Sequence, residues 1–253
     1  MEKTKIESFI KKYTLGGVIN SAVWKNNQDN LTVTAMTSDK KLFASVELDG
    51  AAKGFIEGQD VGVMTTDRLK KMFALLDENV SLTLDLDDKD KTRARQILID
   101  DGKVTEHYVT SEPSAMDPVP SMKNVPPFEV EINLTPEFND KFVRAFSALG
   151  DDGGLFTVVM SKKAKKIDVV FGYKSTGHSD SISLGAYVTA NGGKDKIKNP
   201  LSFTAKNLKE IISANSESES AILRISEAGL AGVSFAKDGL TSQYYLVKVD
   251  VED

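Results

Sequence analysis

Four segments of the chain place apolar residues three and four positions apart, the spacing of a helix that buries one face. Thr135-Pro136 is a favourable start for the third segment, and Thr204 precedes the fourth. In the second segment, Thr66 or Asp67 is expected to cap the helix. The pattern predicts amphipathic helices over residues 6–13, 69–76, 138–149 and 208–212.

Most of the remaining apolar residues alternate with polar ones, as in strands that bury one face of a sheet. Turn-forming residues separate these runs at 26–30, 101–102, 192–193 and 238–239. Helices and strands mixed in this way predict an α+β fold. The predicted strands cover residues 31–36, 42–48, 80–86, 166–173, 181–188 and 221–225.

The middle of the chain differs from both patterns. Residues 111–128 hold five of the seven prolines, and proline donates no hydrogen bond to a sheet, so we expect an extended connector. The order of elements repeats around it: the second and fourth helices match at an offset of 139 residues, the first and third at about 132. We therefore predict two similar α+β domains, 1–110 and 128–253, joined by a connector over 111–127.

The distribution of charge along the chain adds a candidate binding surface to this prediction. The chain has 253 residues and a net charge of −5, so its average surface repels nucleic acid. Each predicted helix nevertheless carries basic residues away from its apolar face. Two interpretations remain open: ordinary solvated faces, shared with carboxylates, or one surface that contacts a phosphate backbone. The basic residues are Lys11, Lys12, Lys70, Lys71, Lys141, Arg144, Lys206 and Lys209.

The sequence offers little catalytic chemistry. There is no cysteine, the only histidines are His107 and His178, and no glycine loop precedes a lysine as in phosphate-binding sites. The start is too charged for a signal peptide, and no apolar run is long enough to span a bilayer. We expect a cytoplasmic protein, in the host cytoplasm if viral or the nucleus if eukaryotic, that is not an enzyme and uses no metal or cofactor.

Three polar clusters are each expected to form a turn, and two of them have an alternative interpretation. Carboxylates at 85, 87, 88 and 90 favour a solvated hairpin turn, although a metal-dependent phosphoryl-transfer enzyme would also use such a group. Residues 151–154 favour a turn after a helix. The lysine run at 162–166 favours a solvated turn, with a contact at the rim of a DNA site as the alternative.

The order of these elements resembles a known family. The end of the chain, QYYLVKVDVED over residues 243–253, is similar to the closing strand and acidic tail of DNA sliding clamps, the family of proliferating cell nuclear antigen and the related phage clamps. Residues 9–12, 30–36 and 42–48 follow the family's helix and strand order, and the connector lies where the family crosses between domains. Val247-Lys248 replaces the usual small-proline pair and the connector is rich in proline, which indicates a viral or divergent clamp.

The resemblance implies a head-to-tail homotrimeric ring. Its helices would line a channel around double-stranded DNA, its antiparallel sheets would lie outside, and the eight basic residues would face the phosphates without sequence specificity. The strand around 103–110 would pair with the strand around 181–188 of the next subunit. A DNA polymerase and a clamp loader would be partners. The alternative is a monomeric polymerase accessory subunit of the same fold. The implied pocket for a partner peptide contains Phe43, Val119, Met122, Leu230, Tyr245, Leu246 and Val247, with Met116 as a weaker candidate.

Overall fold

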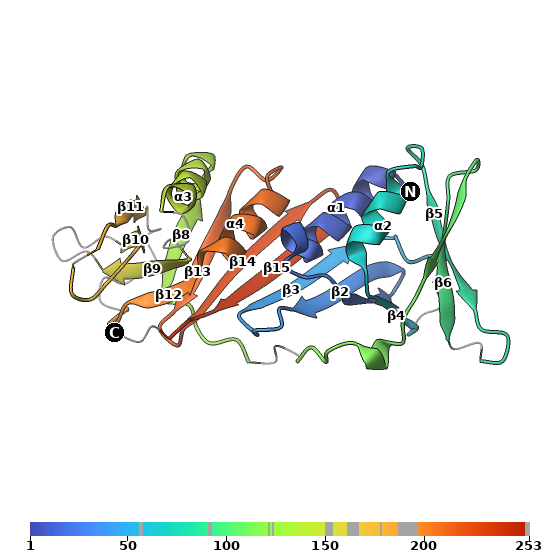
Figure 1. Cartoon of the computed structure of the whole chain (residues 1–253), viewed down its shortest axis with the longest axis horizontal. Helices are drawn as coiled ribbons and strands as arrows, with labels where there is room; N and C mark the ends of the chain where they lie inside the picture. The colour runs from blue at the N-terminus through green and yellow to red at the C-terminus, as the bar shows by residue number, and fades with distance from the viewer. Residues whose placement is uncertain are drawn as a thin grey trace. The chain divides into compact units, whose positions relative to one another are not determined.

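The structure, a computed structural model, describes residues 1–55, 58–90, 93–120, 122, 124–149, 154–160, 167–177, 179–186 and 197–250. The chain forms two compact units, traced in Figure 1. The division between Ser121 and Met122 falls within the predicted connector. Unit 1 contains Met1–Thr37, Ala44–Ser121 and Ala236–Ser242; unit 2 contains Ser38–Phe43, Met122–Phe235 and Gln243–Asp253.

Unit 1 combines two helices with antiparallel strands. In one sheet the strands lie in the order β4-β1-β2-β3, and a separate sheet has the order β5-β6-β7. The helices are α1 (Lys3–Thr14) and α2 (Thr66–Phe73), with a 3-10 turn, η1 (Leu15–Gly17), after α1 and another, η2 (Pro113–Ala115), in the connector. The strands are β1 (Ala22–Asn27), β2 (Asn30–Met36), β3 (Leu42–Leu48), β4 (Asp60–Val63), β5 (Ser81–Leu86), β6 (Ala94–Asp100) and β7 (Thr105–Val109).

The apolar face of α1 packs on the β1 strand as the periodicity predicted. Phe9 lies edge-on to Trp24, with ring centroids 5.6 Å apart, and Trp24 Nε1 donates to the hydroxyl of Tyr13 at 3.2 Å. Burial of that hydroxyl raises the pKa of Tyr13 far above its ordinary value. The bond satisfies two polar groups that would otherwise be costly inside an aromatic core.

The predicted start of α2 is wrong by one residue. Thr66 is the first helical residue, and its hydroxyl donates to the carbonyl of Asn20 at 2.8 Å. Thr65 occupies the cap position without a side-chain cap bond, and Asp67 lies in the first turn. A bond to a residue 46 positions away therefore replaces the local cap that the sequence pattern suggested.

The turn between β1 and β2 has two residues, Gln28 and Asp29, both in the left-handed region with φ of 53° and 67°. This is the geometry of a tight hairpin turn. Asn26 stabilises it, since its side-chain oxygen accepts from Asp29 N at 3.0 Å and its amide nitrogen donates to the carbonyl of Phe55 at 2.9 Å. The predicted turn at 26–30 is confirmed.

The acidic cluster between β5 and β6 forms a hairpin turn, as the favoured interpretation held. Asp87 Oδ1 accepts from the backbone N–H of Lys89 at 2.8 Å and of Asp90 at 3.2 Å, and Arg95 pairs with Asp85 at 2.9 Å. The described residues contain no group of three or more histidine or acidic side chains placed to hold a metal ion.

Asp101 organises the turn between β6 and β7. Its carboxylate accepts from the backbone N–H groups of Asp77, Val104 and Lys103 at 2.8, 2.7 and 2.8 Å, and these bonds lower its pKa from 3.8 to about 2. The stabilisation is fully present above pH 3.8 and is lost as the pH falls towards 2. We expect Asp101→Asn to lower the free energy of unfolding at pH 7 and to remove this part of the acid sensitivity.

Urea unfolding of both proteins between pH 7 and pH 2 tests this expectation. Asp117→Asn, at an exposed carboxylate of the same unit, is the matched control. Parallel pH profiles for Asp101→Asn and the unchanged protein would contradict it.

Unit 2 repeats the plan of unit 1. After β8 (Val130–Leu134), its elements follow the order helix, four strands, helix, three strands, which is the order from α1 to β7. The sheet order β12-β9-β10-β11 matches β4-β1-β2-β3 strand for strand. The last three strands and β8 are hydrogen-bonded neighbours in the order β15-β14-β13-β8, and residues Ala236–Ser242 of β14 and β15 are the part counted in unit 1. The elements are α3 (Pro136–Ala148), β9 (Leu155–Met160), β10 (Ile167–Phe171), β11 (Ile182–Ala186), β12 (Leu201–Thr204), α4 (Ala205–Ala214), β13 (Ala221–Ser226), β14 (Leu230–Lys237) and β15 (Leu240–Val247).

The core of unit 2 forms under α3. Thr135 caps the helix as predicted, its hydroxyl accepting from Phe138 N at 3.2 Å. The ring of Phe142 packs on Phe171 and Phe156, with centroids 4.9 and 5.4 Å apart. The shared element order of the two units agrees with the predicted α+β fold class, whereas the predicted domain bounds remain a prediction. His178, the lysine run at 162–166 and residues 151–153 lie outside the described residues.

Candidate nucleic-acid interface and docking surface

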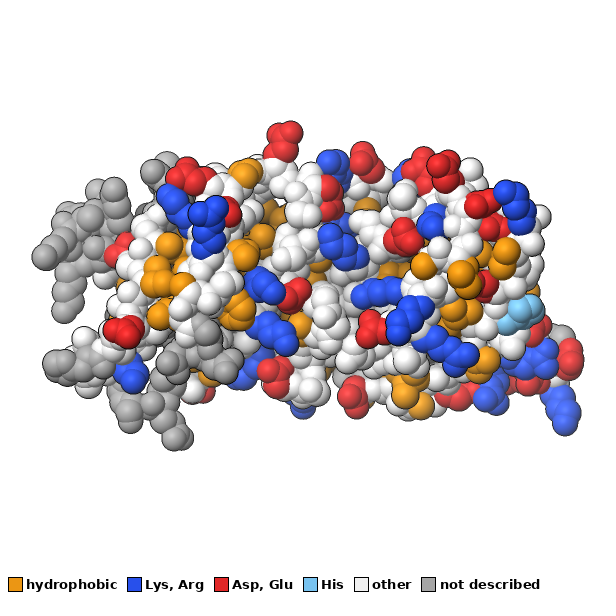
Figure 2. Space-filling model, turned by 45° about the horizontal axis from the view of Figure 1, so that its top comes forward, with side chains coloured by type: hydrophobic (Ala, Val, Ile, Leu, Met, Phe, Trp, Pro, Cys, Tyr) orange, Lys and Arg blue, Asp and Glu red, His pale blue; other side chains and the backbone are white. Residues whose placement is uncertain are grey.

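The four helices carry a charge opposite to that of the whole chain. They hold 11 of the 32 lysines and arginines but only 5 of the 37 aspartates and glutamates. In Figure 2, blue basic side chains and red acidic ones are interspersed over the face shown. Most of this excess belongs to α1 and α2, since α3 holds two basic and two acidic residues and α4 holds two basic and one acidic. A positive excess on the helices of an acidic protein is the distribution expected of a local phosphate-binding surface.

Most of the predicted basic residues lie on the solvent side of their helices. Lys70 and Lys209 are half-buried. Burial lowers the pKa of Lys70, and Asp67, 3.8 Å away, partly offsets this. The exposed residues of the set are Lys11, Lys71, Lys141, Arg144 and Lys206.

The prediction that Lys12 lies on the solvent side is wrong. Lys12 is 2 % exposed. Its neighbours Tyr13 and Thr14 are also buried, as is Phe9 one turn earlier, so α1 buries a wider stripe than the apolar spacing indicated. Lys12 is therefore removed from the candidate DNA-facing set.

Several of these basic side chains already form ion pairs along their helices. Lys141 Nζ lies 2.7 Å from Glu137, which lowers the pKa of that carboxyl, and Arg144 lies 3.1 Å from Asp140. Exposed pairs four residues apart contribute little to stability, because water and salt screen them. Such weak pairs can exchange for phosphate contacts, but their carboxylates also reduce the positive potential of α3.

On α4, Lys209 has two neighbours. Its ammonium lies 2.9 Å from Glu210 and 5.7 Å from the centre of the Phe146 ring. The ring belongs to α3, so this contact fixes one flank of α3 against α4.

The candidate docking surface depends on the alternation of side chains along β15. Tyr245 shares a face with Gln243, whose amide donates to the tyrosine hydroxyl at 2.7 Å. The ring of Phe43 lies 6.0 Å from that of Tyr245. Leu246 points to the opposite face and is 1 % exposed, so its prediction as a pocket wall is wrong because successive strand residues face opposite sides.

The other predicted pocket residues are divided between the units. Met122, Leu230 and Val247 are half-buried residues of unit 2, together with the nearly buried Phe43 and Tyr245. Val119, also half-buried, belongs to unit 1, as does Met116.

Sequence reasoning missed two residues of this surface, Phe128 and Gly232. A Cβ at Gly232 would lie 3.0 Å from Phe128 Cζ and 3.2 Å from Tyr245 Cε1, so the absence of a side chain leaves room for both rings. We call Phe43, Phe128 and Tyr245 the aromatic cluster. A glycine inside a predicted strand is the signal that could have indicated this close approach.

We expect Gly232→Ala to destabilise the protein by about 1–3 kcal/mol, because the methyl group must displace two packed rings. Thermal and urea unfolding measure this loss. Gly185→Ala is the matched control in the same unit, since a Cβ there meets its nearest neighbour, Asp168 Oδ1, at an ordinary 4.0 Å. Equal free energies of unfolding for Gly232→Ala and Gly185→Ala would contradict this expectation, because the two rings would then accept the methyl group without cost.

The segment after β15 is held by three hydrogen bonds, two between backbone groups and one from a lysine side chain. Lys248 N donates to the carbonyl of Gly229 at 2.9 Å, Val249 N donates to that of Ser202 at 2.8 Å, and Lys41 Nζ donates to that of Lys248 at 3.0 Å. The aliphatic part of Lys248 lies over Gly229. Lys248 is thus held in place by its backbone and by its side chain.

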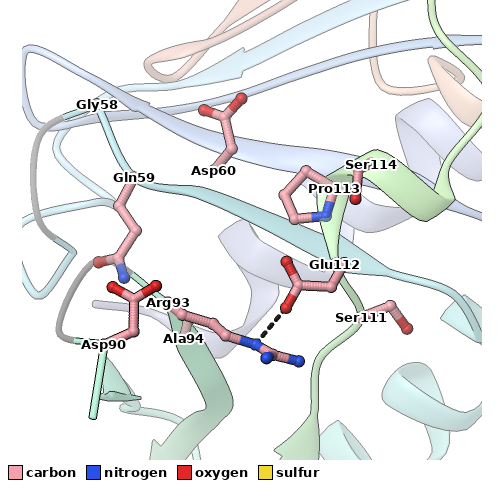
Figure 3. A pocket seen from close by; sticks show the side chains of 10 residues that line it. All are labelled: Gly58, Gln59, Asp60, Asp90, Arg93, Ala94, Ser111, Glu112, Pro113 and Ser114. Carbon is pink, nitrogen blue, oxygen red and sulfur yellow. Dashed lines mark ion pairs between the residues drawn. The ribbon is translucent and has the colours of Figure 1, made fainter. Parts of the chain in front are cut away.

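Unit 1 has a polar cavity of about 510 Å³ at the start of the connector. In Figure 3 the side chains of Arg93 and Glu112 point toward one another across it and form an ion pair. Asp60 at its border pairs with Lys25 at 2.8 Å. The cavity is lined by charges that are already paired, and sequence reasoning gave no sign of it.

The duplicated plan of these units is the fold of sliding clamps of the proliferating cell nuclear antigen (PCNA) type. Three solved structures match nearly the whole chain. PCNA from Entamoeba histolytica is 17 % identical, with 99 % of this chain and 97 % of that chain covered and a TM-score of 0.71. A. fulgidus PCNA bound to the C-terminal region of FEN-1 is 12 % identical, with coverage of 100 % and 98 % and a TM-score of 0.72.

The third structure, the PCNA2–PCNA3 complex from Sulfolobus tokodaii, is 13 % identical, with coverage of 98 % and 97 % and a TM-score of 0.68. No protein-family model and no curated protein matches the sequence. At these identities the likeness establishes the fold. No helix among the described residues has the length and apolar character needed to cross a membrane.

Proposed function

We propose that this protein is a DNA sliding clamp, a non-enzymatic homotrimeric ring that encircles double-stranded DNA and tethers a DNA polymerase. The observation that carries the proposal is the positive charge of all the helices taken together, on a PCNA-like fold whose net charge is −5. Contacts from such helices would reach only the phosphate backbone and would not read sequence. The protein would work where DNA is copied, in the cytoplasm or the nucleus according to the host.

The internal repeat supports the ring. In the repeat, β11 corresponds to β3 and β7 corresponds to β15. Asp49, just after β3, donates from its N–H to the carbonyl of Gly239 before β15, at 2.9 Å within unit 1. Their counterparts β7 and β11 each end a sheet in the described part of the chain. A second copy of the chain would supply the missing neighbour and would close both edges.

The free edge of β7 has backbone groups available for such pairing. Thr110 N bonds to Arg95 O and Asp101 N bonds to Val104 O, so the even-numbered residues of β7 face β6 in this antiparallel register. The N–H and C=O groups of Thr105, His107 and Val109 therefore point away from β6. They are the groups that the next copy's β11 would bond.

The aromatic cluster is the proposed docking surface for partners. The A. fulgidus PCNA structure holds the C-terminal region of FEN-1, which shows that a clamp of this fold binds a peptide segment. We propose that the polymerase and a clamp loader of this system dock peptide segments beside Phe43, Tyr245 and Val247. Tethering raises the polymerase's effective concentration at the primer end without any chemistry by the clamp.

Retention on DNA tests the function directly. The assembled protein is loaded onto nicked circular DNA, and the DNA is then linearised. A ring is expected to stay on the circle through a high-salt wash and to slide off after cutting. Equal, strongly salt-dependent binding to circular and linear DNA would contradict the ring and support the monomeric accessory subunit instead.

A further inference from the structure

Lys12 and Arg144 occupy the same position in the internal repeat. The offset of 132 residues that superposes Ile6 on Phe138 also places Lys12 on Arg144. Lys12 is 2 % exposed, whereas the side chain of Arg144 is 79 % exposed. One basic helix position is therefore covered in the first repeat and open in the second.

The corresponding sheet edges also differ between the two repeats, since one is covered in the first repeat and its counterpart is open in the second. β3, in the first repeat, has β15 residues bonded at its end, as the Asp49–Gly239 contact shows. β11 is the counterpart of β3, ends its sheet in the described residues, and lies against α3. Because Phe146 on one flank of α3 meets Lys209 of α4, Lys141 and Arg144 lie on its other side. A strand added beside β11 would cover that open side.

The strand proposed to lie there, β7 of the next copy, carries a buried carboxylate. Glu106 is 8 % exposed, lies opposite Ile99 and shares the inner face of β7 with Tyr108. Its Oε2 atom is buried without a hydrogen-bond partner among the described residues. Burial raises the pKa of Glu106, and the negative charge of Asp101 adds to the shift. A carboxylate in this position is costly until a cation meets it.

We propose that Arg144 of one copy forms an ion pair with Glu106 of the next copy in the ring. The inference rests on the proposed function, because it needs β7 and β11 to pair between copies. A planar guanidinium can donate to both oxygens of a carboxylate, which would satisfy the orphaned Oε2. The pair with Asp140 that Arg144 forms in the single chain is exposed and weak, so it does not prevent the exchange.

Light scattering across a dilution series, with Glu106→Gln, Arg144→Ala and the double variant, tests the pair. We expect each single change to raise the dissociation constant of the trimer at least tenfold and the double change to add little to the larger single effect. Arg144→Glu is expected to yield the mass of one subunit, and Arg144→Lys to restore part of the assembly. Because Arg144 is exposed, its substitutions are expected to leave the fold of the single chain intact, and circular dichroism checks the fold of every variant, Glu106→Gln included.

Lys206→Glu is the matched control, an equal charge reversal on α4, and is expected to assemble normally. Full additivity of the two single effects, or assembly of Arg144→Glu like the unchanged protein, would overturn the pairing while leaving the ring in place. A single-subunit mass for the unchanged protein at every concentration would instead overturn the ring, and the pairing with it.

Discussion

Replacing Lys11, Lys71, Lys141 and Lys206 with alanine is expected to reduce clamp-dependent DNA synthesis on the order of tenfold at physiological salt, with no change in the assembled mass. All four residues are exposed and lie on different helices. For each phosphate contact that is lost, the plot of the logarithm of the DNA-binding constant against the logarithm of salt concentration becomes less steep by about 0.9. The variant should therefore be less salt-sensitive as well as weaker.

The matched control removes the same charge elsewhere. Lys40, Lys53, Lys89 and Lys237 are exposed lysines outside the four helices, and changing them to alanine gives the same net charge. This second variant should support synthesis like the unchanged protein. Equal losses in both variants would mean that total charge matters and that the helices are not the DNA-facing surface.

The second large effect is expected from His107→Pro, which should convert the proposed assembly, about three times 27.6 kDa, into single subunits. His107 lies at the centre of β7, and its N–H points to the free edge, so proline removes no bond to β6. At each interface between copies, the carbonyl oxygen that would accept from the His107 N–H would lose its hydrogen bond. An unsatisfied acceptor costs about 1–3 kcal/mol, or roughly one to two powers of ten in affinity. The loss occurs at every contact of a closed ring.

His107→Ala separates the backbone from the side chain. It keeps the N–H and removes the imidazole, which bonds to Gln96 at 3.0 Å in the single chain. Sizing with light scattering should show His107→Ala assembled and His107→Pro dissociated, with both folded by circular dichroism. An assembled His107→Pro variant would exclude β7 as an interface strand.

The helices were predictable because their signal is local. Ile6, Phe9 and Ile10 lie on the buried face of α1, and Thr135 caps α3, as spacing and capping rules indicated. The burial of Lys12 was not predictable, because it depends on how much of α1 the rest of the fold covers. The spacing of apolar residues identifies one buried face of a helix, whereas the exposure of each side chain depends on every element that packs around that helix.

The same distinction applies to the strands and the docking surface. β4 and β12 have four residues each and are buried on both faces for most of their length, so they show no alternation to detect. The approach of Phe128 to Tyr245 across Gly232 joins residues more than 100 positions apart. Leu246 was misplaced because a match to a motif does not by itself say which face of the strand a residue occupies.

The repeated order of helix, four strands, helix and three strands bears on how the chain evolved. Two units with one plan and little sequence identity are what the duplication of a gene for a single unit leaves after long divergence. Before duplication every copy had the same helix position and the same strand edges. On that account Lys12, now buried, and Arg144, now exposed, would descend from that one position. Duplication would thus have allowed contacts made once, when the chain folds, to evolve apart from contacts that, in the proposed ring, would open each time DNA enters.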